Sequence, residues 1–123
     1  MDPSFANKLS KKRDKYREQL ATALTEDPDP LAVYDSFIKW TVESYGSHLA
    51  QSGLIELLDE ATRHFVDDDV YKNDLRYLKL WLLYASHVED PTMIYQFLIQ
   101  KNIGRNYAQT YQELADALER QGR

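Results

Sequence analysis

Apolar residues recur at steps of three and four along most of the 123-residue chain, a spacing typical of amphipathic α-helices. Asp29 and Asp90 each precede a proline, and this pair of residues commonly opens a helix. Asn73 is a candidate N-cap for a further helix. The pattern predicts six helices, over about residues 4–25, 30–45, 53–66 and 74–88, from residue 91 to near residue 104, and over 106–121.

No segment alternates apolar and polar residues with a period of two, and no Asn-Gly hairpin turn occurs. We therefore expect an all-α protein, either an α-solenoid or a small bundle. Internal similarity favours the solenoid, because DPLAVYDSF and DPTMIYQFL both begin with Asp-Pro and place a tyrosine four residues after the proline. AQTYQELADALERQG has the small-aromatic-small pattern of the first helix of a tetratricopeptide (TPR) repeat.

These features predict a TPR-like α-solenoid of about six antiparallel helices. A charged N-terminal helix over residues 1–26 would precede the helical domain over residues 27–123. The sixth helix lacks the second helix of its repeat, so we expect the chain to be a fragment of a longer protein that ends within a repeat.

The fourth predicted helix, within YKNDLRYLKLWLLYA, is more apolar than one buried face requires. Projected at 100° per residue, it has a broad apolar face made of Leu75, Leu78, Trp81, Leu82, Ala85 and Val88. A second apolar face holds Tyr77, Leu80 and Tyr84. Tyr77 and Leu80 stay undecided between core and surface, whereas the phenol of Tyr84 suits a wet rim. We expect a groove for an amphipathic peptide, lined by Tyr84, Val88, Ile94 and Leu98.

Composition restricts the possible functions. The chain is 43% hydrophobic and 28% charged, lacks cysteine, and has no apolar run near the roughly 18 residues of a membrane span. Its net charge is −5, with eleven acidic and three basic residues between positions 27 and 74. An acidic middle argues against nucleic-acid binding, which requires a basic surface. The basic cluster between residues 8 and 17 is best explained as a solvated helix face.

Catalytic and metal-binding patterns are missing from the sequence. His48, His64 and His87 lie in separate segments and form no HExxH motif. The run from Asp67 to Asp69 near His64 lacks the ligand spacing and the glycine of an EF-hand. There is no glycine-rich phosphate loop and no serine elbow. We expect a non-catalytic chain without cofactor or metal, hence a binding module or a structural, self-associating module.

Three ordered stretches resemble the N-terminal domain shared by the BUB and MAD spindle-checkpoint proteins. They are DPLAVYDSFIKWTVESY, YKNDLRYLKLWLLYA and NIGRNYAQTYQELADALERQG, and together they span residues 29–122. One departure is Asn102, where the family usually has glycine. The resemblance implies a TPR-like interaction module of a mitotic checkpoint protein that acts in the nucleus.

The resemblance implies that in the BUB kinases this domain docks short amphipathic motifs of a kinetochore scaffold protein of the KNL/Spc (blinkin) family. By motif position Tyr84 matches a family contact residue, and Val88 and Ile94 match others. In MAD-type members an upstream KEN motif engages the activator of the anaphase-promoting complex. No KEN tripeptide occurs in this chain, and both the BUB-kinase branch and the MAD-type inhibitory element stay open.

Overall fold

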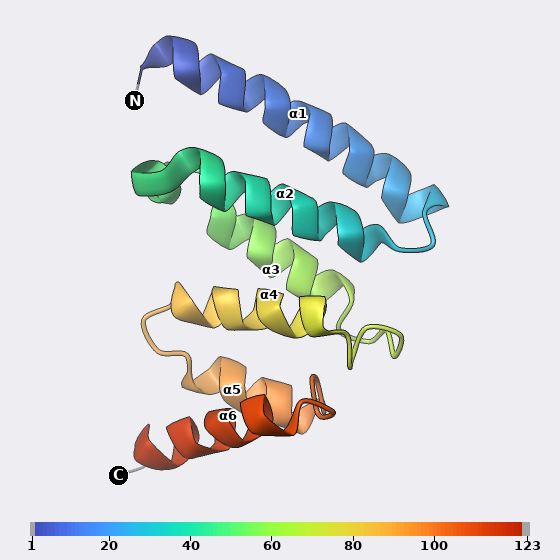
Figure 1. Cartoon of the computed structure of the whole chain (residues 1–123), viewed down its shortest axis with the longest axis vertical. Coiled ribbons are helices and arrows are strands. Elements are labelled where there is room, and N and C mark those ends of the chain that lie inside the picture. The colour runs from blue at the N-terminus through green and yellow to red at the C-terminus, as the bar shows by residue number, and fades with distance from the viewer. Residues whose placement is uncertain (1, 122–123) are drawn as a thin grey trace. The chain divides into compact units, whose positions relative to one another are not determined.

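Helices account for the regular secondary structure of the chain, whose computed structural model describes residues 2–121 apart from the side chains of residues 108–111, 113 and 121 (Figure 1). No strand occurs in this range, so the all-α prediction is confirmed. The α-helices match the six predicted helices to within a few residues, and residues 46–51 form an additional 3₁₀ helix that the pattern did not predict. In chain order the elements are α1 (Pro3–Glu26), α2 (Pro30–Tyr45), η1 (Gly46–Gln51), α3 (Leu54–His64), α4 (Leu75–Ser86), α5 (Thr92–Gln100) and α6 (Ala108–Gln121).

Two compact units make up the chain, and the boundary between them lies inside α3, between Leu57 and Leu58. The first unit contains α1, α2 and η1. The second contains α4, α5 and α6 together with most of α3. The boundary predicted after residue 26 falls in the turn between α1 and α2, where the amide of Asp29 donates to Oδ1 of Asp27 at 2.8 Å. That turn joins two helices of the same unit.

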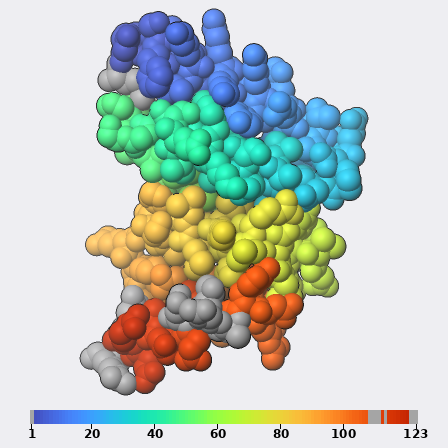
Figure 2. All heavy atoms as spheres, viewed as in Figure 1, coloured from blue at the N-terminus to red at the C-terminus, as the bar shows by residue number. Residues whose placement is uncertain are grey.

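In the first unit α1 and α2 run antiparallel and pack through aromatic side chains (Figure 1). The Tyr16 ring stacks on Phe37 with centroids 5.1 Å apart and lies 5.3 Å from the ring of Trp40. The guanidinium of Arg17 lies 5.3 Å from the centroid of the same Phe37 ring, a cation–π contact. The space-filling view shows atoms of α1 and α2 in contact along both helices (Figure 2). Aromatic contacts therefore join α1 to α2 within this unit.

The start of α4 in the second unit is fixed by Asp74, not by the predicted cap Asn73. Oδ1 of Asp74 accepts a hydrogen bond from the amide of Arg76 at 2.9 Å, and its Oδ2 pairs with the Arg76 guanidinium at 2.7 Å. These hydrogen bonds hold the pKa of the Asp74 carboxyl below its ordinary value. Oδ1 of Asn73 instead accepts from the amide of Asn106 at 3.2 Å, so this side chain connects two loops.

Tyr77 and Leu80, which the sequence left undecided, both belong to the core. Each is buried, and the Tyr77 hydroxyl donates to the backbone carbonyl of Thr62 in α3. Burial raises the pKa of the Tyr77 phenol to about 12, so the hydroxyl stays a hydrogen-bond donor. Leu75, expected on the core face, is instead 39% exposed, because it is the first residue of α4 and lies at the end of the helix.

The loop between α5 and α6 packs closely against α4 through Gly104. This glycine has φ +75°, a conformation that suits a residue without a side chain. A Cβ at this position would meet Cδ2 of Leu78 at 2.8 Å, well inside van der Waals contact. The amide of Gly104 also donates to the carbonyl of Lys72 at 2.6 Å, which ties this loop to the loop before α4. The two loops thus brace the start of α4 together.

Candidate functional site

A mostly apolar groove of about 450 Å³ opens on the second unit. Three side chains come from α3, one from the turn after it, two from α4 and three from α5. Such a volume lies within the range of about 300–1,000 Å³ that is usual for ligand sites in proteins. The lining residues are Asp59, Thr62, Arg63, Val66, Trp81, Tyr84, Met93, Ile94 and Phe97.

Three aromatic rings form one side of the groove. The ring of Trp81 is stacked with that of Tyr84, with centroids 6.3 Å apart and an interplanar angle of 11°. It is tilted by 39° against the ring of Phe97, at 5.2 Å. Trp81 is buried, whereas Tyr84 and Phe97 are half-buried and present ring surface to solvent. Packing against a buried tryptophan keeps these two rings in place, so the surface is preformed.

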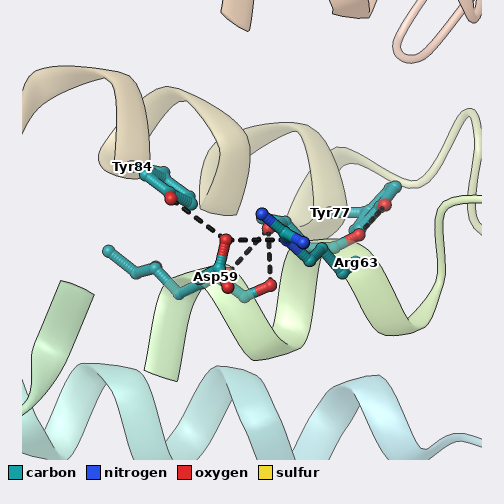
Figure 3. Close-up of polar contacts among 6 residues, drawn as sticks. Asp59, Arg63, Tyr77 and Tyr84 are labelled. Carbon is teal, nitrogen blue, oxygen red and sulfur yellow. Dashed lines mark hydrogen bonds and ion pairs between the residues drawn. The ribbon is translucent and has the colours of Figure 1, made fainter. Parts of the chain in front are cut away.

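A polar edge runs along α3 beside the rings (Figure 3). The Tyr84 hydroxyl donates to Oδ1 of Asp59 at 3.1 Å, and Nε of Arg63 donates to the same oxygen at 2.8 Å. Burial and the hydrogen bond to Asp59 both raise the pKa of the Tyr84 phenol. The phenol therefore stays neutral at physiological pH, and its bond to Asp59 fixes the ring against α3.

The mouth of the groove carries exposed apolar surface. Met93 is 78% exposed, although it lies on α5 directly beside the half-buried Ile94. An exposed apolar residue is common by itself, but here it adjoins an apolar hollow, and such contiguous patches mark interaction sites. The flexible thioether side chain of methionine can adapt to the shape of a bound partner.

The structure places the four predicted contact residues in different environments. Tyr84 and Ile94 both line the groove. Val88 is half-buried in the joint after α4, outside the lining, where its amide donates to the carbonyl of Ala85 at 3.4 Å. Leu98 is fully buried, and its carbonyl accepts from the amide of Ile103 at 3.0 Å. Because it has no exposed surface, Leu98 is a core residue in this structure, and we leave it out of the contact set.

Sequence reasoning missed the contribution of α3. Read from the sequence alone, Asp59 is one more acidic residue on a helix surface, and nothing singles out Arg63. Both lie more than twenty positions before Tyr84, so no spacing within one helix brings the three side chains together. The available signal was the pairing of an acidic and a basic residue four positions apart on one helix, next to an unusually apolar α4.

A larger hollow of about 660 Å³ lies in the first unit, near the turn between α1 and α2. Its lining includes three carboxylates, from Glu18, Glu26 and Asp27. It contains no aromatic ring. The groove on the second unit is therefore the better candidate for binding an apolar motif, despite its smaller volume.

Two further properties bear on the class of function. Among the described residues, no group of three or more histidine, cysteine or acidic side chains is arranged to hold a metal ion. In the same part of the chain, none of the helices combines the length and the apolar character needed to cross a bilayer.

Comparison with known proteins places these features in a family. Residues 11–123 match the family described as Mad3/BUB1 homology region 1. The chain is 35% identical over 115 residues to the mitotic spindle checkpoint component mad3 of Schizosaccharomyces pombe. The matched region is 93% of this chain but 37% of that protein, so the chain spans little more than a third of the length of this relative.

Solved structures agree with the sequence match. A chain in a crystal structure of a mitotic checkpoint complex superposes with a TM-score of 0.84 and 32% identity, over 98% of this chain and 56% of the other. The conserved N-terminal domain of the checkpoint component BUB1 superposes with a TM-score of 0.78 over 94% of this chain and 65% of that domain chain; at 21% identity it supports the fold alone. The TPR-like all-α fold is thereby confirmed. The chain belongs to the BUB/MAD family of spindle-checkpoint proteins and corresponds to their N-terminal domain, Mad3/BUB1 homology region 1.

Proposed function

We propose that this domain is a non-catalytic docking module that binds a short amphipathic segment of a kinetochore scaffold protein of the KNL/Spc (blinkin) family. The segment would lie in the groove formed by α3, α4 and α5, and binding would bring the checkpoint protein to kinetochores. The observation that carries the proposal is the preformed apolar groove with exposed Met93 at its mouth. Membership of the family makes a mitotic partner the natural candidate.

The driving force would be burial of apolar surface. Full burial of a methionine-sized side chain contributes about 1.5–3 kcal/mol, and the ring surfaces of Tyr84 and Phe97 would add to it. The rings are already fixed by Trp81 and by the Tyr84–Asp59 hydrogen bond, so little ordering of the groove opposes binding. A helical segment with apolar residues at three- and four-residue steps has the right shape for such a groove.

Isothermal titration calorimetry of the chain against peptides tiled along a kinetochore scaffold protein tests the proposal. We expect one peptide to bind, and Tyr84→Ala to weaken it at least tenfold, since central aromatic anchors dominate small interfaces. Met93→Ala should weaken it less. Val70→Ala provides a matched control, because Val70 is 79% exposed but lies in the loop before α4, outside the groove lining.

Absence of binding by every tiled peptide would overturn the proposal. The alternative function, a self-associating structural module, would use the same exposed apolar surface against a second copy of the chain. Analytical ultracentrifugation separates the two: docking requires a monomer with an accessible groove, and self-association requires a dimer that Tyr84→Ala and Met93→Ala dissociate.

A further inference from the structure

Arg63 stands at the polar edge of the groove, and the described residues engage only one of its nitrogens. Its Nε donates to Oδ1 of Asp59 at 2.8 Å. Among the described residues, Asp59 is the ion-pair partner of Arg63. A guanidinium carries five N–H donors, so the two terminal nitrogens retain four of them. The Arg63 side chain is 77% exposed and belongs to the lining of the groove.

We infer that the segment bound in the groove carries an aspartate or glutamate beside its apolar anchors, and that the terminal nitrogens of Arg63 pair with this carboxylate. The inference rests on the proposed function, because it concerns the same groove. It assigns to Arg63 the selection of the partner's charge, a role separate from the apolar anchoring at Tyr84 and Met93.

The hydrogen bonds of Asp59 explain why an acidic partner is preferred over a basic one. One carboxylate oxygen of Asp59 already accepts from both Tyr84 and Arg63. Its side chain is 38% exposed, about half the exposure of the Arg63 side chain. Among the described residues that line the groove, Asp59 and Arg63 are the charged ones. An approaching side chain therefore meets the cation first, and a lysine would be repelled by it.

The Asp59 carboxylate also orients the guanidinium. It accepts a hydrogen bond from Nε of Arg63, which lies four residues later on the same helix (Figure 3). The hydroxyl of Tyr84 on α4 donates to the same carboxylate and fixes its position. A guanidinium held at Nε presents its terminal nitrogens as a planar fork, a geometry that matches a carboxylate. Less side-chain freedom is then lost when the partner binds.

The expected effect is on selectivity more than on total affinity. Exposed ion pairs contribute little in open solvent, but a partner that covers the groove excludes water from this edge and strengthens the pairing. We therefore expect a preference of about three- to tenfold for the acidic side chain, together with a loss of this preference at high salt.

Synthetic amphipathic peptides of fifteen residues test the inference directly. Each carries leucine or phenylalanine anchors at helical spacing, and glutamate, glutamine or lysine replaces each polar position in turn. Fluorescence anisotropy with the intact chain should show at least one position where glutamate binds more tightly than glutamine, and glutamine more tightly than lysine. Arg63→Gln should abolish this order, and Arg63→Glu should reverse it.

The control is Lys79→Glu, which changes the net charge as Arg63→Glu does, at an exposed position of α4 outside the groove lining. It should leave the order of the peptides unchanged. If wild-type protein binds the three peptides equally at every position while Tyr84→Ala still weakens all of them, the inference is wrong and the docking function stands. If neither these peptides nor the scaffold peptides bind, both fail. The comparison of peptides on wild-type protein does not depend on the folding of any variant.

Discussion

Two aromatic clusters of the same make-up, each with one tyrosine, one phenylalanine and one tryptophan, serve different purposes in the two units. In the first unit Tyr16, Phe37 and Trp40 join α1 to α2, with Phe37 fully buried. In the second unit Trp81, Tyr84 and Phe97 line an open apolar groove. Aromatic content alone therefore does not identify a binding surface. Each cluster has one buried ring and two half-buried rings, so exposure does not separate them either. What distinguishes the second cluster is that all three of its rings line one apolar groove.

The largest expected difference between the clusters is in stability. Phe37→Ala removes a fully buried ring that stacks on Tyr16, and it should lower the free energy of unfolding by about 3–5 kcal/mol. Tyr84→Ala removes a half-buried ring and should cost about 1–2 kcal/mol. Urea denaturation followed by circular dichroism measures both. Equal costs would mean that the groove ring is as much a core residue as Phe37, and the contrast between the clusters would be lost.

A second test addresses the loop that braces α4. Gly104→Ala adds a methyl group against Leu78 at a positive φ and should destabilise the chain by about 2–4 kcal/mol. Gly46→Ala is the matched control, since Gly46 has φ +49° but a Cβ there would meet nothing within 4 Å, and it should cost only about 1 kcal/mol. Thermal unfolding of the two variants compares them. If the two variants lose the same stability, crowding by Leu78 contributes nothing.

The cap of α4 gives a smaller, pH-dependent effect. Asp74→Ala should cost about 1 kcal/mol at neutral pH, because it removes the N-cap and the partner of Arg76. The pKa of Asp74 is lower in the folded chain than its ordinary value, so its ionisation stabilises the fold above that ordinary value. The stabilisation is lost as the pH falls through the folded-state pKa. Urea titrations between pH 7 and about pH 2 should therefore converge for wild type and variant, and a constant gap would contradict this role.

The smallest effect is expected from Tyr84→Phe, which keeps the ring and removes the hydroxyl that donates to Asp59. Stability should fall by about 0.5–1 kcal/mol, and affinity for the apolar peptide should change less than threefold. Calorimetry of Tyr84→Phe and Tyr84→Ala with the same peptide separates the contribution of the ring to affinity from that of the hydroxyl. A loss of affinity as large as that of Tyr84→Ala would show that the hydrogen bond, not the ring, is the anchor.

The sequence predicted the helices well because a period of 3.6 residues is a local property. Of the four residues predicted to line a groove, Tyr84 and Ile94 lie in the groove lining, whereas Leu98 is buried in the core. It could not decide whether Tyr77 is buried, because that depends on a carbonyl of α3 fifteen positions earlier. The choice between Asn73 and Asp74 as the cap likewise depended on Asn106, thirty-three positions later, which binds the Asn73 side chain.

The two tryptophans offer the most direct measurement, because each lies in one of the two clusters and each has one indole N–H signal. Proton–nitrogen correlation spectra would be recorded on the intact chain while the scaffold peptide that binds in calorimetry is added. We predict that the Trp81 signal shifts or broadens up to saturation while the Trp40 signal stays in place. A bound peptide that shifts Trp40 and leaves Trp81 unchanged would contradict docking in the groove of α3, α4 and α5.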